Sequence, residues 1–290
     1  MPGPETVLPR PPRLTAAYAR AVLPRRRRPD APLPDRSLAL AAAVPHPDRV
    51  RAYARLCGAP DDDRLPVGYP HLLAFPLTMA LLTAPDFPCP PLGLVQLANE
   101  ISCLRPLAAA EPLAVRVTAV AAAPRPRGRA FEVRAEVSDA RGLPVWRGSS
   151  TYLHRSGPGG AARGAGRAPD AEPALDSPAL TARWPLAAGL GRRYARVSGD
   201  RNPIHLHPLT ARPFGFRRPI AHGMWSKARA LAALADELPE AFTARARFLA
   251  PVPLPSRPAF AATPRAGGGW LFQLSAADGR RQLAGEIVPH

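Results

Sequence analysis

The amino-acid sequence predicts an α+β fold in which one unit occurs twice in tandem, each copy a long central helix wrapped by a curled antiparallel sheet. The first observation is an internal repeat: residues 53–58 read YARLCG, and residues 194–199 read YARVSG. The second is that each copy continues with a polar loop and then an apolar helical stretch. The third is that strand-like runs follow each helical stretch.

Both central helices are expected to begin beside a proline, whose fixed φ suits the first helical turn. The first starts near Pro70 and runs to Leu82, and the second starts near Pro219 and runs to Leu234. The stretches that follow also correspond, with residues 100–107 parallel to residues 247–254.

The predicted strands occupy equivalent places in the two copies. Residues 130–137 alternate in polarity, turn at residues 139–142 and continue as a strand over 145–153. In the second copy residues 270–274 run to an Asp278-Gly279 hairpin signal, and a last strand covers 282–288.

Composition excludes several function classes. The chain of 290 residues is 46% apolar and carries a net charge of +17, but Lys227 is its only lysine and the arginines are scattered without a nucleic-acid motif. We therefore expect no nucleic-acid partner, although a basic surface could attract an acidic carrier protein or the phosphates of coenzyme A.

The cysteines and the apolar runs point to a cytoplasmic protein. The three cysteines, Cys57, Cys89 and Cys103, have no C-x-x-C spacing, so we expect reduced, buried thiols rather than disulfides. The N-terminus lacks the apolar core of a signal peptide, and no apolar run is long enough to span a membrane.

The chemistry-bearing residues gather between positions 198 and 224. Asp200 and His205 lie five residues apart in a loop that Pro203 keeps from being helical, so a carboxylate can orient an imidazole as a base or acid. Gly223 is expected in the first turn of the second central helix, where unpaired N–H groups can hold a developing oxyanion. Two other interpretations stay open: an Asp–His pair that only anchors the loop, and a glycine that only allows close packing. The histidine spacing matches no zinc pattern, so no metal is expected.

The first copy lacks this chemistry. His71 aligns with His222, but Leu72 stands where the second copy has Gly223, and nothing corresponds to His205. We therefore expect His222 to belong to the scaffold. The predicted organisation is an N-terminal extension over 1–40, a degenerate repeat over 41–155, a flexible linker over 156–178 and a catalytic repeat over 179–290.

The loop SGDRNPIH (198–205) followed by RRPIAHGM (217–224) resembles the hydratase signature of the MaoC-like dehydratases, or (R)-specific enoyl-CoA hydratases (hydratase 2). The first half resembles the degenerate repeat of the two-repeat 3-hydroxyacyl-thioester dehydratases. The resemblance implies a double hotdog fold and reversible addition of water to the C2=C3 bond of a trans-2-enoyl thioester in fatty-acid or related acyl metabolism.

The resemblance also implies roles for individual residues. Asp200 and His205 would hold and activate one water, the Gly223 N–H would polarise the thioester carbonyl, and Asn202 and Ser198 would support the loop. Neither a metal nor a cofactor is implied, because the substrate itself carries coenzyme A or the phosphopantetheine of an acyl carrier protein. The degenerate half would make room for the acyl chain, next to its apolar side chains Phe75 and Met79.

Two alternatives remain: a non-catalytic acyl-thioester-binding subunit and a hotdog acyl-CoA thioesterase. Acyl chain length, the carrier and homodimer formation stay open.

Overall fold

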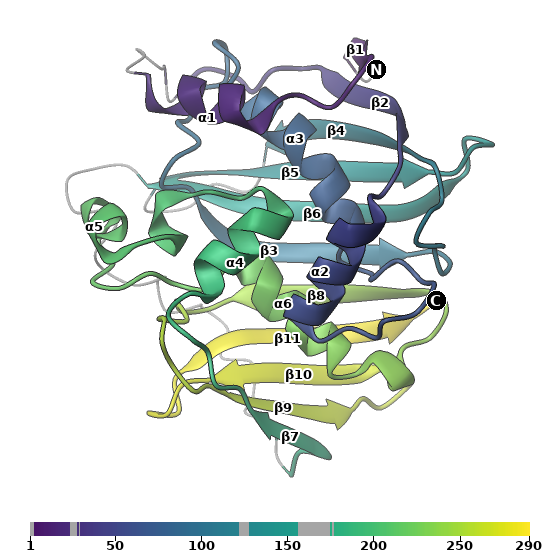
Figure 1. Ribbon diagram of the computed structural model, residues 1–290, viewed down its shortest axis with the longest axis vertical. Helices are drawn as coiled ribbons and strands as arrows, with labels where there is room; N and C mark the ends of the chain where they lie inside the picture. Colours follow the sequence, from purple (N-terminus) through teal and green to yellow (C-terminus); the bar gives the residue numbers. More distant parts are fainter. Residues whose placement is uncertain (1–2, 24–27, 29, 122–127, 156–174, 176) are drawn as a thin grey trace.

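One sheet runs through the whole molecule, and the main helices lie on one face of it (Figure 1). The computed structural model describes residues 3–23, 28, 30–121, 128–155, 175 and 177–290. Within these residues 11 strands pair in the order β1-β2-β4-β5-β6-β3-β8-β11-β10-β9-β7. The first half supplies β2 (Ser37–Ala43), β3 (Val95–Cys103), β4 (Leu113–Ala121), β5 (Gly128–Ser138) and β6 (Pro144–Arg155). The second half supplies β7 (Leu180–Arg183), β8 (Phe242–Phe248), β9 (Ala259–Pro264), β10 (Trp270–Ser275) and β11 (Arg281–Pro289).

The two halves have the same strand connectivity, which confirms the predicted fold class. In each half the five strands lie side by side in the order first, third, fourth, fifth and second along the chain. The second strands, β3 and β8, pair antiparallel with Ile101 opposite Ala244 and so join the halves into one sheet. Side chains along β4 and β5 are alternately buried and more exposed, because one face of the sheet is covered by the helices. This explains why apolar and polar residues alternate in these sequences.

The repeated YAR motif forms the end of a helix in each half. The helices α2 (Pro47–Cys57) and α4 (Leu190–Ser198) pack against each other, and the rings of Tyr53 and Tyr194 lie 6.2 Å apart. Each helix ends at a left-handed glycine, Gly58 with φ 70° and Gly199 with φ 82°. A residue with a Cβ is strained in this conformation, which explains the glycine that closes each copy of the motif.

The two central helices are α3 (Pro70–Leu82) and α6 (Gly223–Ala232). The first matches its expected range, but the second was predicted to start at Pro219 and starts at Gly223 instead. The intervening residues are extended because the Ala221 N–H donates to the Val252 carbonyl at 2.8 Å and Ile220 forms a β-bridge with Pro253. Because these residues pair with the segment at Val252 and Pro253, they cannot be helical, and α6 begins only at Gly223.

A buried lysine marks the junction between the halves. Lys227 of α6 has no exposed surface, and burial lowers its pKa. Its ammonium donates to the Asn99 Oδ1 at 2.6 Å, to the Asn99 carbonyl at 3.1 Å and to the Ala244 carbonyl at 2.9 Å. One cation therefore ties α6 to both strands of the junction.

The expected N-terminal extension contains two elements. The strand β1 (Glu5–Leu8) pairs in parallel with β2, and α1 (Leu14–Val22) packs on α3. The expected boundary at residue 40 falls inside β2. The expected linker, 156–178, lies outside the described residues except for 175, 177 and 178. The boundaries themselves remain predictions.

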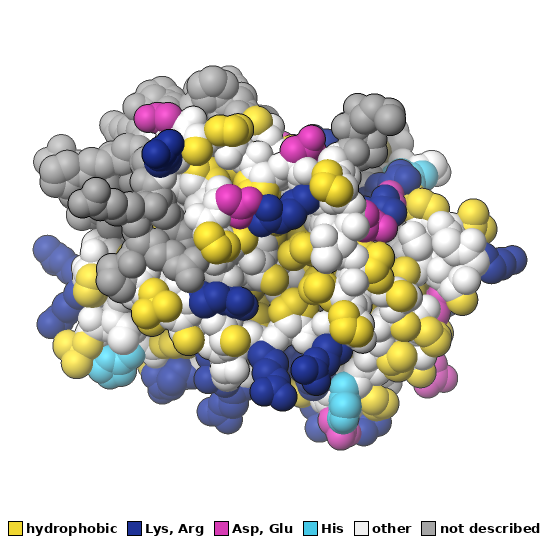
Figure 2. Space-filling model, turned by 90° about the horizontal axis from the view of Figure 1, so that it is seen from above, with side chains coloured by type: hydrophobic (Ala, Val, Ile, Leu, Met, Phe, Trp, Pro, Cys, Tyr) yellow, Lys and Arg dark blue, Asp and Glu magenta, His cyan; other side chains and the backbone are white. Residues whose placement is uncertain are grey.

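The described part of the chain contains no helix that is both long and apolar enough to cross a bilayer. On the face in Figure 2, basic side chains are scattered among apolar and acidic ones, in keeping with the scatter seen in the sequence.

Candidate active site

The loop between α4 and α6 is shaped by hydrogen bonds around Asp200. The Ser198 hydroxyl donates to the Tyr194 carbonyl at 2.9 Å and accepts from the Asp200 N–H at 3.1 Å. The Asn202 N–H donates to Asp200 Oδ1 at 3.0 Å, which closes a tight turn at the carboxylate. The contact that Asn202 makes to the loop comes from its main-chain N–H, since its buried side-chain oxygen has no hydrogen-bond partner among the described residues.

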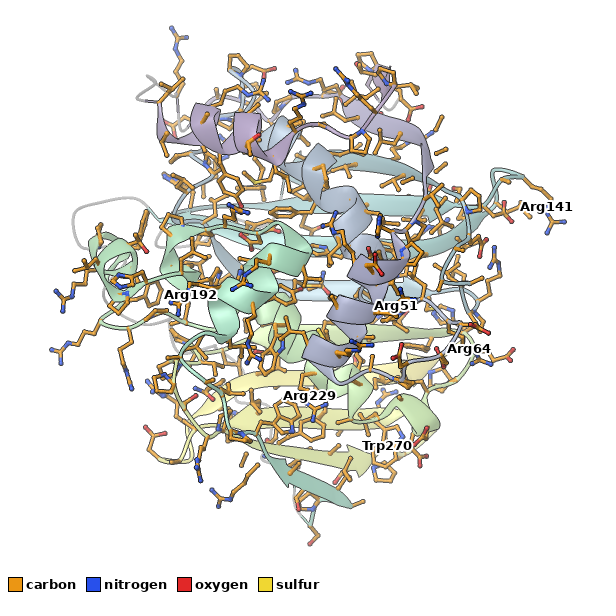
Figure 3. The ribbon with its side chains drawn as sticks, in the orientation of Figure 1. Arg51, Arg64, Arg141, Arg192, Arg229 and Trp270 are labelled. Carbon is orange, nitrogen blue, oxygen red and sulfur yellow. The ribbon has the colours of Figure 1, made fainter. Side chains whose placement is uncertain are left out.

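The rest of the loop is short helical turns pinned to α4. These are η1 (Pro203–His205), α5 (Pro208–Ala211) and η2 (Arg212–Phe214), and the side chain of His207 caps α5. Arg192, labelled in Figure 3, donates from Nη1 to the Leu206 carbonyl at 3.0 Å. The carbonyl of His205 lies so close to Gly191 that a Cβ there would sit 2.0 Å from it. Only glycine lets the loop approach α4 this closely.

Asp200, His205 and His222 converge at one point. One ligand-type atom from each lies within 4.8 Å of the others. The two imidazoles stack with their centroids 3.7 Å apart, and His222 Nε2 lies 3.8 Å from Asp200 Oδ2. His205 and His222 are buried, whereas the Asp200 side chain is 30% exposed. The predicted carboxylate–imidazole pair is therefore brought together, with a second imidazole behind it.

The hydrogen bonds assign the protons on the two rings. His205 Nδ1 faces the Ile220 carbonyl at 2.8 Å, and His222 Nε2 faces the Asp200 carbonyl at 3.0 Å. A carbonyl only accepts, so each of these nitrogens carries a hydrogen. In the neutral state His205 Nε2 then keeps a free lone pair. His222 holds the main chain at Asp200 against the start of α6, which agrees with its expected scaffold role.

Burial and neighbouring groups set the charge states. Burial lowers the pKa of His205, although Asp200 and the Ile220 carbonyl act in the opposite direction. Burial lowers the pKa of His222 to about 3. For Asp200, burial alone would raise the pKa, but His222, His205 and the Asn202 N–H hold it below its ordinary value. At neutral pH the site thus presents a carboxylate beside neutral imidazoles.

Gly223 begins α6 and lines a cavity that also contains Asp200, His205 and His222 in its wall. The first N–H groups of a helix have no acceptor within the helix and carry partial positive charge. A Cβ at Gly223 would lie 2.9 Å from the ring of Phe248. Close packing therefore requires glycine here, and the same absence of a side chain leaves the N–H open to a ligand.

A mostly apolar cavity of about 150 Å³ includes Asp200, His205 and His222 in its lining. The first half supplies much of its wall, from α3 and the segment that follows it: His71, Leu72, Phe75, Met79, Leu82, Pro91, Leu92 and Leu94. The second half adds Phe248 and residues 250–252. Burial lowers the pKa of His71 to about 4, while the charge of Asp200 acts in the opposite direction. The half without the Asp–His loop thus still faces the site.

Two residues at the site were missed in the sequence. Tyr18 donates its hydroxyl to Asp200 Oδ1 at 3.4 Å from a helix 182 positions away in the chain. His71, for which the sequence predicts no role of its own, lines the cavity. The spacing of Leu14, Ala17 and Tyr18 marked an amphipathic helix, but nothing local connects it to the loop at Asp200.

The Asp–His–His cluster has the residue types of a metal site. His205 Nδ1 and His222 Nε2 each face a main-chain carbonyl, so one nitrogen of each ring is already engaged and only the other nitrogen could bind an ion. That the protein works without a metal remains a prediction.

The chain is similar to several known proteins. Residues 171–264 match the family described as "MaoC like domain". The chain is 34% identical over 261 residues to "3-hydroxyacyl-thioester dehydratase X" of Mycobacterium tuberculosis, with 89% of each protein covered. The crystal structure of HtdX from the same organism superposes with a TM-score of 0.76 at 31% identity, covering 88% of this chain and 100% of that chain. A MaoC-like dehydratase from Phytophthora capsici has the same fold, with a TM-score of 0.72 at 22% identity over 90% of this chain and 97% of that chain.

Proposed function

Because the chain belongs to the MaoC-like dehydratase family, a family of hydro-lyases acting on acyl thioesters, we propose that it is an (R)-3-hydroxyacyl-thioester dehydratase. In the reverse direction it hydrates a trans-2-enoyl thioester. The observation that carries the proposal is the meeting of the Asp200 carboxylate and the His205 imidazole in the lining of an apolar cavity, together with Gly223 at the start of α6.

The two side chains suit the handling of one water molecule. Asp200 is an acceptor, and His205 Nε2 offers a lone pair because Nδ1 donates to the Ile220 carbonyl. In hydration they hold a water whose oxygen bonds to C3 of the enoyl thioester, and the proton it loses is delivered to C2. In dehydration the C2 proton is removed and the C3 hydroxyl leaves as water, so atoms and charge balance in both directions.

The start of α6 suits the thioester carbonyl. Negative charge develops on this oxygen when C2 gains carbanion character. The Gly223 N–H at the positive end of the helix stabilises that charge, and the missing side chain admits the carbonyl. The activated thioester makes the C2 proton removable, so the proposed reaction needs no further cofactor.

The apolar wall from the first half suits the acyl chain. Phe75 and Met79 of α3 line the cavity with aliphatic neighbours. We assign this half to substrate holding. The thioester is borne by coenzyme A or by the phosphopantetheine of an acyl carrier protein, and the exposed Arg217 and Arg218 are candidates for contacts to its phosphates. We place the protein in the cytoplasm, in fatty-acid or related acyl metabolism.

The purified 290-residue protein should hydrate enoyl-CoA substrates. The reaction is monitored by the decrease in absorbance of the conjugated thioester. The single variants Asp200→Asn and His205→Gln should each lower kcat by about 100- to 10,000-fold, the usual contribution of a general acid or base. The matched variants Asp236→Asn and His46→Gln change exposed residues of the same types and should retain full activity.

Unchanged kcat in both Asp200→Asn and His205→Gln would contradict the assignment. Release of free thiol from saturated acyl-CoA would instead indicate a thioesterase. Acyl-CoA binding without turnover at any chain length would indicate a non-catalytic binding protein.

A further inference from the structure

The helix α1 lies against both halves of the site, although it belongs to the N-terminal segment. It packs on α3, at the same end of the sheet as β1 and β2 (Figure 1). Ala17 is completely buried against Phe75 and Met79, and Leu14 and Tyr18 pack on the same cluster. Because Phe75 and Met79 line the apolar cavity, α1 covers the outside of the cavity wall.

The helix also contacts the turn that carries Asp200. Gly199 has φ +82°, and a Cβ built on it would lie 2.4 Å from Leu14 Cδ1. The turn at Gly199 therefore leaves just enough room for a side chain of α1. This close fit is independent of the hydrogen bonds made by Tyr18.

The Tyr18 hydroxyl makes two hydrogen bonds to the loop. It accepts from the Arg201 N–H at 2.6 Å and donates its own hydrogen to Asp200 Oδ1 at 3.4 Å. Burial raises the pKa of Tyr18, and the Asp200 charge raises it further, so the phenol stays protonated and acts as a donor. Tyr18 and Asp200 both line the cavity.

These contacts divide the two oxygens of the carboxylate. Oδ1 accepts from the Asn202 N–H at 3.0 Å and from Tyr18. Oδ2 lies 3.8 Å from His222 Nε2. The hydrogen bonds to Oδ1 restrict rotation of the carboxylate and leave Oδ2 available to another partner.

We propose that Tyr18 is a positioning residue of the active site, which orients and stabilises the Asp200 carboxylate so that Oδ2 faces the reacting water. The role of Oδ2 in the reaction rests on the proposed function. The hydrogen bond from Tyr18 to Oδ1 is a property of the folded protein and exists without turnover.

The test is Tyr18→Phe in the full-length protein, which removes the hydroxyl and keeps the ring packed on Phe75 and Met79. We expect kcat to fall about tenfold with KM nearly unchanged, as for loss of one hydrogen bond to a charged group. The hydroxyl stabilises the ionised carboxylate, so its removal raises the Asp200 pKa and moves the acidic limb of the pH–rate profile to higher pH. Tyr69→Phe is the control, since Tyr69 is a buried tyrosine of the first half that does not line the cavity.

A second readout needs no turnover. The Asp200 carboxyl is titrated by carbon NMR in wild type and Tyr18→Phe, with Asp200→Asn assigning the signal. A higher Asp200 pKa in Tyr18→Phe supports the proposal, even if the protein hydrates none of the thioesters tried. An unchanged Asp200 pKa overturns it, as does a variant that alters only KM for long acyl chains, which would mean that α1 merely covers the cavity.

Discussion

Replacing Lys227 by Met probes the junction between the halves. The methionine side chain fills nearly the same volume, but it removes the ammonium that donates to Asn99 Oδ1, to the Asn99 carbonyl and to the Ala244 carbonyl. All of these groups lie in the interior, where no bulk water replaces the lost donor. The change thus isolates the contribution of one buried cation.

The expected cost follows from opposing contributions. Three hydrogen bonds to a charged donor contribute about 5–9 kcal/mol in total. Taking an ammonium out of water costs several kcal/mol, so most of this gain is offset. The orphaned Asn99 Oδ1 adds about 1–3 kcal/mol of its own. We expect Lys227→Met to lower the free energy of unfolding by about 3 kcal/mol, in the range for a broken buried charge contact.

Urea denaturation measures this free energy, with the m-value as the check that the unfolding reaction is unchanged. A double-mutant cycle with Asn99→Leu measures the coupling between the two residues. Lys227→Met removes the donor to Asn99 Oδ1, and Asn99→Leu removes this acceptor from Lys227. The double variant should be less destabilised than the sum of the two by about 1–3 kcal/mol. Additive effects, or a Lys227→Met protein as stable as wild type, would refute the assigned contacts.

Four further outcomes are expected. Gly223→Ala places a Cβ against Phe248 and should lower kcat about 100-fold by displacing the start of α6. Gly189→Ala is the control in the same assay and should leave kcat unchanged, because its Cβ meets only the end of an arginine side chain. Because burial lowers the pKa of His222 to about 3, the unfolded chain binds a proton at this residue that the folded chain does not. The contribution of His222 to stability is therefore present above about pH 6.5, and about 2 kcal/mol of it is lost by pH 5. Urea midpoints at pH 7 and pH 5 check this, and the loss should be smaller in His222→Gln. Met79→Trp fills the cavity and should lower kcat/KM for long enoyl chains more than for crotonyl-CoA, and equal losses would place the acyl chain elsewhere. Dialysis against EDTA should leave the hydration rate unchanged, and recovery of lost activity by added zinc would contradict a metal-free mechanism.

The fold could be predicted because the sequence contains two copies of the same structural unit. Both copies repeat a helix end that needs a left-handed glycine, and the first central helix starts at a proline, Pro70; both are local requirements. The start of α6 was misplaced by four residues because the β-bridge between Ile220 and Pro253 is a long-range contact. Proline at position 219 is equally compatible with an extended segment.

The loop of the candidate site was predictable in the same way, since Asp200, His205 and Gly223 lie within one short stretch of chain. The residues that complete it come from elsewhere. Tyr18 reaches Asp200 only because α1 packs on α3, and His71 reaches it only because the two halves share one sheet. Neither contact leaves a periodicity or spacing in the sequence.

The pairing of β3 with β8 has a consequence for how this protein responds to dilution. Two separate chains that met along such an edge would come apart at low concentration, and the cavity between them would be lost. Here both edges belong to one polypeptide, so the effective concentration of one half around the other does not depend on how much protein is present. The cavity wall from the first half and the Asp–His loop from the second therefore stay together down to single molecules. Because the halves are inherited as one gene, each can change its sequence without the same change appearing in the other.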